Sequence, residues 1–152
     1  MREIPFRGKR LDTGEWVKGY YVKTESGNAL IINNVAEYGC GYCIETIESI
    51  GNYEVDTDTV GQYTGLEDKN GVKIFEGDIV RYKNRFECEY GCVKFGLYDN
   101  KQDQGFYIQW PEETYWRSDL GFWAVRHDRK KYLEVIGNIH DNPELLHKEL
   151  TP

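Results

Sequence analysis

Short segments with alternating side chains, separated by glycine-containing turns, recur along most of this chain. Between residues 16 and 23, for example, Trp16, Tyr20 and Val22 fall on one face of an extended segment, and Val17 and Tyr21 on the other. A period of two is typical of β-strands, and the 16 Gly and 12 Tyr suit short strands joined by tight turns. The pattern predicts a mainly β, β-rich α+β fold, with small twisted or partly open barrel-like sheets and a short C-terminal helix.

The strongest local signal lies between residues 68 and 83. An Asn-Gly pair supplies the positive φ angles of a tight turn, a short strand 73–75 follows, and Glu-Gly-Asp breaks it before the strand 79–83. A small sheet needs such a break to turn a corner. The residues that we assign to this structural turn motif are Asn70, Gly71, Glu76, Gly77 and Asp78.

The second half of the chain continues the strand pattern. The segments predicted to be extended are 85–90, 92–98, 106–110, 122–126 and 132–139, with Gly91 separating the first two. Asn142, Pro143 and Glu144 then have the residue types of a helix start, because Asn caps, Pro suits the first position and Glu complements the helix dipole.

Three pieces of the chain resemble the YopX family of bacteriophage and prophage proteins. They are the central run 60–80 (VGQYTGLEDKNGVKIFEGDIV), the opening 1–7 (MREIPFR) and residues 134–146 (EVIGNIHDNPELL). The resemblance implies a phage or prophage protein in the cytoplasm of a bacterial host, and it brings no cofactor or catalytic residue with it. It favours a single YopX-like domain over 1–152; the alternative is an N-terminal β subdomain 1–60 packed on a barrel-like part 61–152.

Composition narrows the classes of partner. The formal net charge of −7 disfavours nucleic acid and anionic membrane surfaces, which are bound largely by Lys and Arg. The start of the chain is charged and lacks the apolar stretch of a secretory signal, and no apolar run approaches the roughly 20 residues that span a bilayer. These features predict a cytoplasmic protein without a membrane partner, in which the cysteines are not disulfide-bonded.

The four cysteines form two close pairs. Thiolates at Cys40, Cys43, Cys88 and Cys92 have spacings that structural zinc sites accept. The alternative is that Cys88 and Cys92, beside strand segments, are small core residues. We favour the alternative and predict no metal.

No catalytic motif stands out. Glu76 and Asp78 flank Gly77, and His127-Asp128 and His140-Asp141 are adjacent pairs, but acid–base or metal chemistry needs such groups to converge. The sequence contains no G-x-S-x-G, Walker or H-E-x-x-H motif. We predict a protein that is not an enzyme and uses no cofactor.

Two segments combine cations with aromatic rings, namely 81–86 (RYKNRF) and 126–132 (RHDRKKY). Cationic grooves with aromatic platforms bind single strands, whereas the plainer interpretation is a strand with one wet face and a solvated loop. Separately, Trp110, Trp116 and Trp123 concentrate aromatic area; most of it suits a core, and any exposed part is a candidate contact surface.

These features give two hypotheses from different classes. The first is a non-enzymatic phage accessory protein that acts through contact with itself, as a homo-oligomer, or with a host or phage protein. The second is a small β-barrel module that binds nucleic acid.

Overall fold

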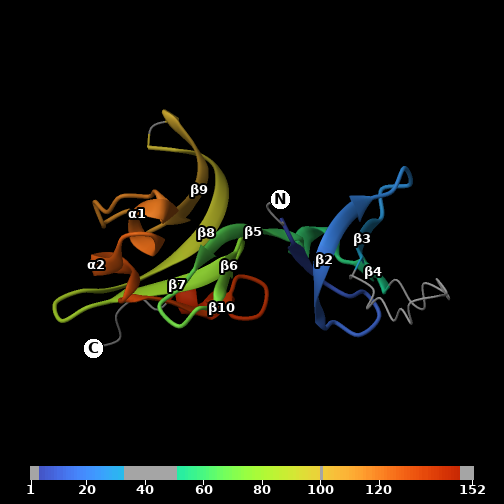
Figure 1. The fold of residues 1–152 in the computed structure, drawn as a ribbon, viewed down its shortest axis with the longest axis horizontal. Helices are drawn as coiled ribbons and strands as arrows, with labels where there is room; N and C mark the ends of the chain where they lie inside the picture. The colour runs from blue at the N-terminus through green and yellow to red at the C-terminus, as the bar shows by residue number, and fades with distance from the viewer. Residues whose placement is uncertain (1–3, 33–50, 100, 148–152) are drawn as a thin grey trace, which may run out of the picture. The chain divides into compact units, whose positions relative to one another are not determined.

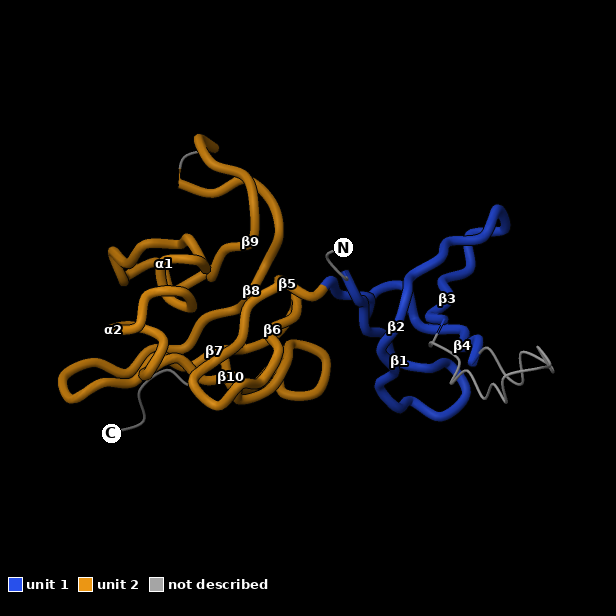
Figure 2. The backbone as a smooth tube through the Cα atoms, viewed as in Figure 1, with its two compact units in different colours: residues 1–62 blue, residues 63–152 orange. Residues whose placement is uncertain are grey.

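The structure, a computed structural model, describes residues 4–32, 51–99 and 101–147. Strands dominate, in antiparallel sheets with only short helices, which confirms the predicted mainly β fold (Figure 1). The chain divides into two compact units, residues 1–62 and 63–152 (Figure 2). This boundary lies close to the one at residue 60 that the sequence offered as an alternative.

Unit 1 contains most of a six-stranded antiparallel sheet with strand order β4-β3-β2-β1-β5-β6, in which β6 and most of β5 belong to unit 2. Its strands are β1 (Phe6–Lys9), β2 (Trp16–Lys23), β3 (Ala29–Ile32), β4 (Asn52–Val55) and the start of β5 (Gly61–Glu67), where Gly61 and Gln62 pair with β1. A 3₁₀ helix, η1 (Thr57–Thr59), follows β4. Ala29, Ile31 and Val55 are buried at the centre of this unit.

Unit 2 contains the remainder of β5 and all later elements. These are β6 (Lys73–Phe75), β7 (Asp78–Lys83), β8 (Cys88–Tyr98), β9 (Asp103–Gln109), α1 (Leu120–Ala124), α2 (His127–Lys130), β10 (Leu133–Asn138) and the 3₁₀ helix η2 (Pro143–His147). The order in its main sheet is β10-β7-β8-β9, so that the sheet is open and has β10 and β9 as its edges.

One face of this sheet carries the larger core. Val80 and Tyr82 of β7, Val93 of β8 and Ile108 of β9 alternate along their strands and are all buried there. Helix α1 covers this face with the buried side chains of Leu120 and Trp123. The opposite face buries Ile79 and Cys92, which are partners in the β7–β8 register, and η2 contacts β8.

Gly91 does not separate two strands, as the sequence suggested, but lies inside the single strand β8. A Cβ at this position would stand 2.4 Å from Cγ2 of Ile108 and 2.8 Å from Cε3 of Trp110. The glycine therefore makes room for the side chains of β9 and the residue after it, while the backbone continues its ladder.

The predicted strand over 122–126 is wrong, because this segment starts in helix α1. The Asp119 side chain accepts a hydrogen bond from the Gly121 N–H at 2.7 Å and so caps the helix. Leu120, Trp123 and Ala124 are the buried residues, with the i, i+3, i+4 spacing of a helix rather than the alternation of a strand.

The short C-terminal helix is present as the 3₁₀ helix η2. Asn142 precedes it as expected, but its side-chain oxygen accepts from the Asn138 N–H at 3.4 Å, and its backbone carbonyl accepts from Leu145 N–H at 3.0 Å. The Asn142 side chain thus ties the helix to the end of β10.

Replacing Gly91 with Ala tests the close packing on β8. The added methyl group has to displace Ile108 and Trp110, so we expect Gly91→Ala to lower the free energy of unfolding by about 1–3 kcal/mol. Urea denaturation followed by tryptophan fluorescence reports mainly on unit 2, which contains three of the four tryptophans; Trp16 belongs to unit 1. Lys94→Ala, at an exposed position of the same strand, is the control and should cost less than about 0.5 kcal/mol; equal losses would contradict the packing account.

Candidate functional site

The two cysteines of β8 have different environments. Cys88 is exposed and Cys92 is buried, and burial raises the pKa of the Cys92 thiol to about 11. Their α-carbons lie about 13 Å apart along the strand, whereas two sulfurs bound to one zinc are within about 4 Å of each other. Cys88 and Cys92 therefore cannot bind one zinc ion together while β8 is formed. Cys40 and Cys43 lie outside the described residues.

The carboxylate and histidine pairs are divided between the two ends of β10. Asp128 belongs to α2, which precedes the strand, and His140 follows the strand, with its Nε2 within 3.8 Å of where a Cβ of Gly77 would lie. The Asn138 side chain accepts from the N–H groups of His140 and Asp141, both at 3.0 Å. Within the described part of the chain, no group of three or more His, Cys, Asp or Glu side chains is placed to hold a metal ion.

The three tryptophans gather around Tyr82 rather than on the surface. Trp110 and Trp123 are 7% and 3% exposed, and Trp116 is half-buried. The indole N–H groups of Trp110 and Trp123 both donate to the Arg117 carbonyl, at 3.1 and 2.7 Å. Burial thus removes Trp110 and Trp123 from the candidate contact surface, since a partner cannot touch them in the folded protein.

The aromatic cluster has a cationic rim. The guanidinium groups of Arg117, Arg126 and Arg129 lie 4.9, 5.4 and 5.4 Å from the centre of the Phe122 ring. Asp128 pairs with Arg126 at 3.3 Å and with Arg129 at 3.8 Å. Three positive charges therefore lie around the Phe122 ring, and cation–π attraction offsets part of their mutual repulsion.

The two cation-rich segments found in the sequence meet in the structure. The Lys83 N–H at the end of β7 donates to the Tyr132 carbonyl at 3.1 Å, and Arg129 Nη1 lies 3.5 Å from the Tyr82 hydroxyl. Beyond Lys83 the β7–β8 turn exposes Arg85 and Phe86. Arg81 does not share this surface, because it points to the other face of the sheet and binds Glu134.

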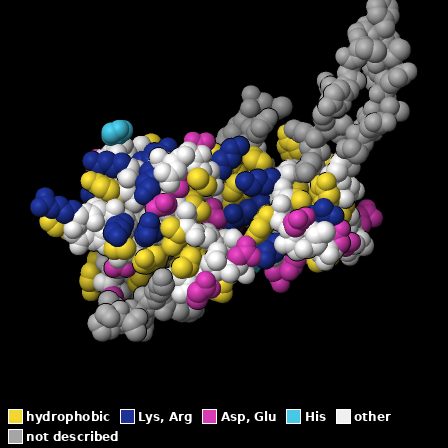
Figure 3. Space-filling model, turned by 90° about the horizontal axis from the view of Figure 1, so that it is seen from below, with side chains coloured by type: hydrophobic (Ala, Val, Ile, Leu, Met, Phe, Trp, Pro, Cys, Tyr) yellow, Lys and Arg dark blue, Asp and Glu magenta, His cyan; other side chains and the backbone are white. Residues whose placement is uncertain are grey.

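We call Arg85, Phe86, Arg117, Phe122, Arg126 and Arg129 the cation–aromatic surface. Figure 3 views the molecule from below, where Lys and Arg side chains of unit 2 lie among hydrophobic and some acidic ones. The sequence pointed to both segments, but it missed Arg117, which joins Phe122 only because α1 folds as a helix.

The predicted turn motif lies in two places: the break at 76–78 precedes β7 at the other end of the sheet, and the turn at 70–71 lies beside the first half of β10. Gly71 and Gly77 have φ values of +78° and +84°, which a residue with a β-carbon rarely adopts. Gly77 donates its N–H to the Val93 carbonyl at 2.8 Å and accepts from the Ile139 N–H at 2.9 Å, so that it connects β8 with the end of β10. The Asp78 carboxylate accepts from the Phe75 N–H at 2.8 Å across the break.

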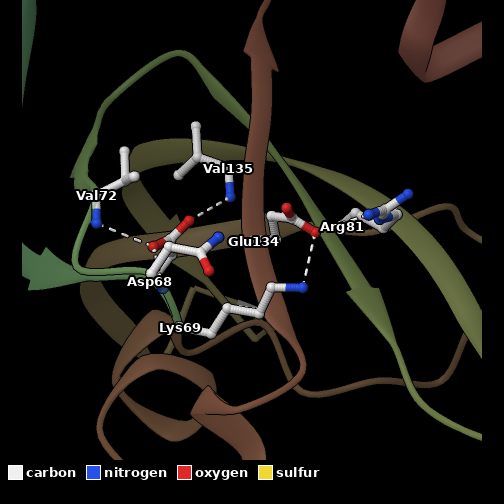
Figure 4. Close-up of polar contacts among 7 residues, drawn as sticks. Asp68, Lys69, Val72, Arg81, Glu134 and Val135 are labelled. Carbon is white, nitrogen blue, oxygen red and sulfur yellow. Dashed lines mark hydrogen bonds and ion pairs between the residues drawn. The ribbon is translucent and has the colours of Figure 1, made fainter.

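A fully buried carboxylate completes this motif. Asp68 Oδ1 accepts from the N–H groups of Asn70 and Val72, at 2.8 and 3.0 Å, and Oδ2 accepts from Val135 N–H of β10 at 2.9 Å (Figure 4). The Asp-x-Asn-Gly pattern predicts the local turn. The bond to Val135 has no local signal, because that residue is 67 positions away.

Beside Asp68, one carboxylate of β10 receives two cations. Glu134 Oε2 lies 2.9 Å from Lys69 Nζ and 2.7 Å from Arg81 Nη2 (Figure 4). The hydrogen bonds from Lys69 and then Arg81 hold the pKa of the Glu134 carboxyl below its usual range. These groups fix the 68–72 turn on β10, the strand that begins shortly after α2.

The fold is thus that of a β-rich protein with two small antiparallel units and a polar turn motif that binds the edge strand. The YopX protein family matches residues 5–147, and the chain therefore belongs to the YopX family, which confirms the resemblance. The crystal structure of protein EF1440 from Enterococcus faecalis is similar over 96% of this chain and 99% of that chain, with 24% identity and a TM-score of 0.49. Comparison with curated proteins finds no match.

A membrane-spanning helix is not found in the described ranges, where every helix is too short or too polar to cross a bilayer.

Removal of the Asp68 carboxylate should destabilise unit 2. Asp68→Ala leaves three backbone N–H groups without their acceptor, and we expect a loss of about 2–4 kcal/mol in the free energy of unfolding. Urea denaturation followed by tryptophan fluorescence measures it. Asp103→Ala, at an exposed position of β9, should change stability by less than about 0.5 kcal/mol. A loss at Asp68 no larger than at Asp103 would show that the turn does not depend on the carboxylate.

The Glu134 ion pairs should contribute to acid unfolding. Because the folded pKa of Glu134 lies below the ordinary value of 4.5, its contribution is complete above that value and is lost as the pH falls through the folded pKa. We therefore expect Glu134→Gln to lower the urea midpoint at neutral pH, and the gap from the wild type to narrow as the pH falls below 4.5. The control is Glu144→Gln, at an exposed position in η2. A gap that stays constant with pH would contradict the role of the charge.

Proposed function

We propose that this YopX protein is a non-enzymatic accessory protein of a phage or prophage, and that it acts in the bacterial cytoplasm through protein–protein contact. Several carboxylate and amide side chains that could serve chemistry instead bind backbone N–H groups at turns: Asp68, Asp78 and Asn138 do so. The observation that carries the proposal is an apolar stripe on the β8–β9 hairpin. It consists of Val93, Phe95 and Leu97 of β8 with Phe106 and Ile108 of β9, and it extends from the core to exposed positions.

The stripe follows from the register of the hairpin. Val93 faces Ile108, Phe95 faces Phe106 and Leu97 faces Gln104, so that all of these side chains lie on one face. Val93 and Ile108 are fully buried, but Phe95 and Leu97 are 52% and 55% exposed. The rings of Phe95 and Phe106 are in edge-to-face contact at 5.0 Å. Figure 1 shows the end of this hairpin extending beyond α1.

The occupant that we propose for the stripe is the same hairpin of a second copy. Strand β9 is an edge of its sheet, and at Ile108 this edge is already bonded, because the Ile108 N–H donates to the Ser118 carbonyl at 2.7 Å. We therefore place the pairing at residues 103–106, since an edge flanked by apolar side chains is a template for pairing. Two copies of one strand pair antiparallel about a two-fold axis, which makes the contact self-complementary. Such pairing would place two Phe106 side chains and both stripes on one continuous sheet. The alternative occupant is a strand of a host or phage protein.

Sedimentation and native mass measurement test this proposal. We expect a dimer from the wild type at micromolar concentration and a monomer from Phe95→Ser/Leu97→Ser, because the stripe loses its exposed apolar area. Leu11→Ser is the control, since Leu11 is 62% exposed but belongs to unit 1, and it should leave the dimer intact. A wild-type protein that is monomeric, or a dimer that survives the double substitution, would overturn the proposal.

A further inference from the structure

Positive charge is segregated within unit 2. This unit has 13 Lys and Arg against 16 Asp and Glu, yet residues 117–131 have five Lys and Arg against two Asp. One of those two, Asp119, accepts from the Gly121 N–H and is committed to the cap of α1. A local field of this sign attracts an anionic partner even on a protein of negative net charge.

The arginines of the cation–aromatic surface retain capacity for an anion. Arg126 and Arg129 are 58% and 37% exposed, and both share the single carboxylate of Asp128. Both also lie over the Phe122 ring, and Arg129 lies near the Trp123 ring and the Tyr82 hydroxyl as well. These neutral groups orient a guanidinium without neutralising it. An oriented guanidinium still has N–H groups for phosphate oxygens, which it can bind in a bidentate manner.

Phe86 offers a flat apolar surface next to these charges. It is 84% exposed at the β7–β8 turn, and the Arg85 guanidinium lies 5.5 Å from its ring centre. The turn itself is held by Asn84, whose side-chain oxygen accepts from the N–H groups of Phe86 and Glu87 at 2.7 and 2.8 Å. The turn thus holds the Phe86 ring in solvent, and the ring takes no part in the core of unit 2.

The ring and the arginines belong to one surface. Asn84, which holds the Phe86 turn, and Arg129 of α2 both reach the Tyr82 hydroxyl, with Asn84 Nδ2 at 3.3 Å and Arg129 Nη1 at 3.5 Å. Two further residues of chain span at most about 7 Å from Asn84 to Phe86. A few nucleotides of an extended strand cover such a distance. Proteins that bind single strands combine cations that follow the phosphates with aromatic rings that stack on bases.

We infer that the cation–aromatic surface of unit 2 binds single-stranded nucleic acid, with phosphates on Arg85, Arg117, Arg126 and Arg129 and a base stacked on Phe86. A single strand fits better than a duplex because only unpaired bases offer a face to the ring. A single strand also fits better than an acidic peptide, because its bases can stack on the exposed Phe86 ring, whereas carboxylates bind only the arginines. The contacts are to phosphate and to base faces, so the surface has little preference for sequence.

Fluorescence anisotropy with a labelled oligothymidylate of about 12 nucleotides tests the inference, since single-strand sites span about 4–16 nucleotides. We expect binding at about 50 mM salt that weakens as the salt rises. Arg85→Gln/Arg126→Gln should weaken binding at least about tenfold and reduce the salt slope by about 1.4, at roughly 0.7 per phosphate contact. Lys18→Gln/Lys23→Gln removes the same charge from exposed positions of unit 1 and should change neither value.

Two substitutions at Phe86 test whether its ring contributes to binding. Phe86→Ala should weaken binding by about tenfold, the typical effect of losing one stacked base, while Phe86→Tyr should restore it. Phe86 is exposed, so neither variant should alter the unfolding curve. The hairpin variant Phe95→Ser/Leu97→Ser should bind the oligonucleotide normally, which separates this inference from the proposed dimer.

Four results would overturn the inference. They are no binding at about 50 mM salt, equal losses in the two charge variants, an unchanged affinity of Phe86→Ala, and equal or tighter binding of a duplex or of an oligoglutamate peptide of the same length. The last of these would assign the surface to a duplex or to an acidic protein segment instead.

Discussion

The buried Asp68 carboxylate is the interaction on which the arrangement of unit 2 depends. It accepts two N–H groups from its own turn and one from Val135 of β10, and so it joins the β5–β6 turn to the edge of the main sheet. A buried charge is costly unless hydrogen bonds satisfy it, and these three donors do so in one geometry only. Because β10 begins shortly after α2, the same contact also helps to place α2, whose Arg129 lies 3.5 Å from the Tyr82 hydroxyl of β7. The polar residues of this motif hold the turn on β10, and in this way they stabilise the unit that carries the cation–aromatic surface.

Two surfaces with different chemistry extend from one aromatic core. Tyr82 lies at the centre of this core, with its ring in edge-to-face contact with Trp116, Trp123 and Tyr132. Toward α1 and α2 the core ends in Phe122, whose ring collects three arginines. Along β8 and β9 it ends in Phe95 and Leu97, which remain largely exposed. The formal net charge of −7 predicts the character of neither surface, because a protein with a negative net charge can still have a local positive field.

The fold class and the turn motif could be predicted from sequence because their signals are local. Alternation identifies strands, and Asn70-Gly71 and Gly77 identify backbone that needs positive φ. The 122–126 segment was misread, because five residues cannot distinguish a strand from one turn of helix without the cap at Asp119. The bond from Asp68 to Val135, the approach of Arg117 to Phe122 and the burial of Trp110 against Gly91 all join distant positions, and no local pattern reports them. Spacing alone allowed Cys88 and Cys92 as zinc ligands, but we favoured core positions, which is confirmed for the buried Cys92 and wrong for Cys88, which is exposed. One strand holds the two thiols too far apart to share an ion.

Amide hydrogen exchange, resolved residue by residue, tests the central claim most directly. If the Asp68 carboxylate holds the turn on β10, the amides of Val72 and Val135 should exchange as slowly as those of Val80 and Val93 in the middle of the sheet, through opening of the whole unit. Rapid exchange at Val72 and Val135 while Val80 and Val93 stay protected would show that the turn opens by itself. In that case the carboxylate would not be what positions β10 and the surface beside it.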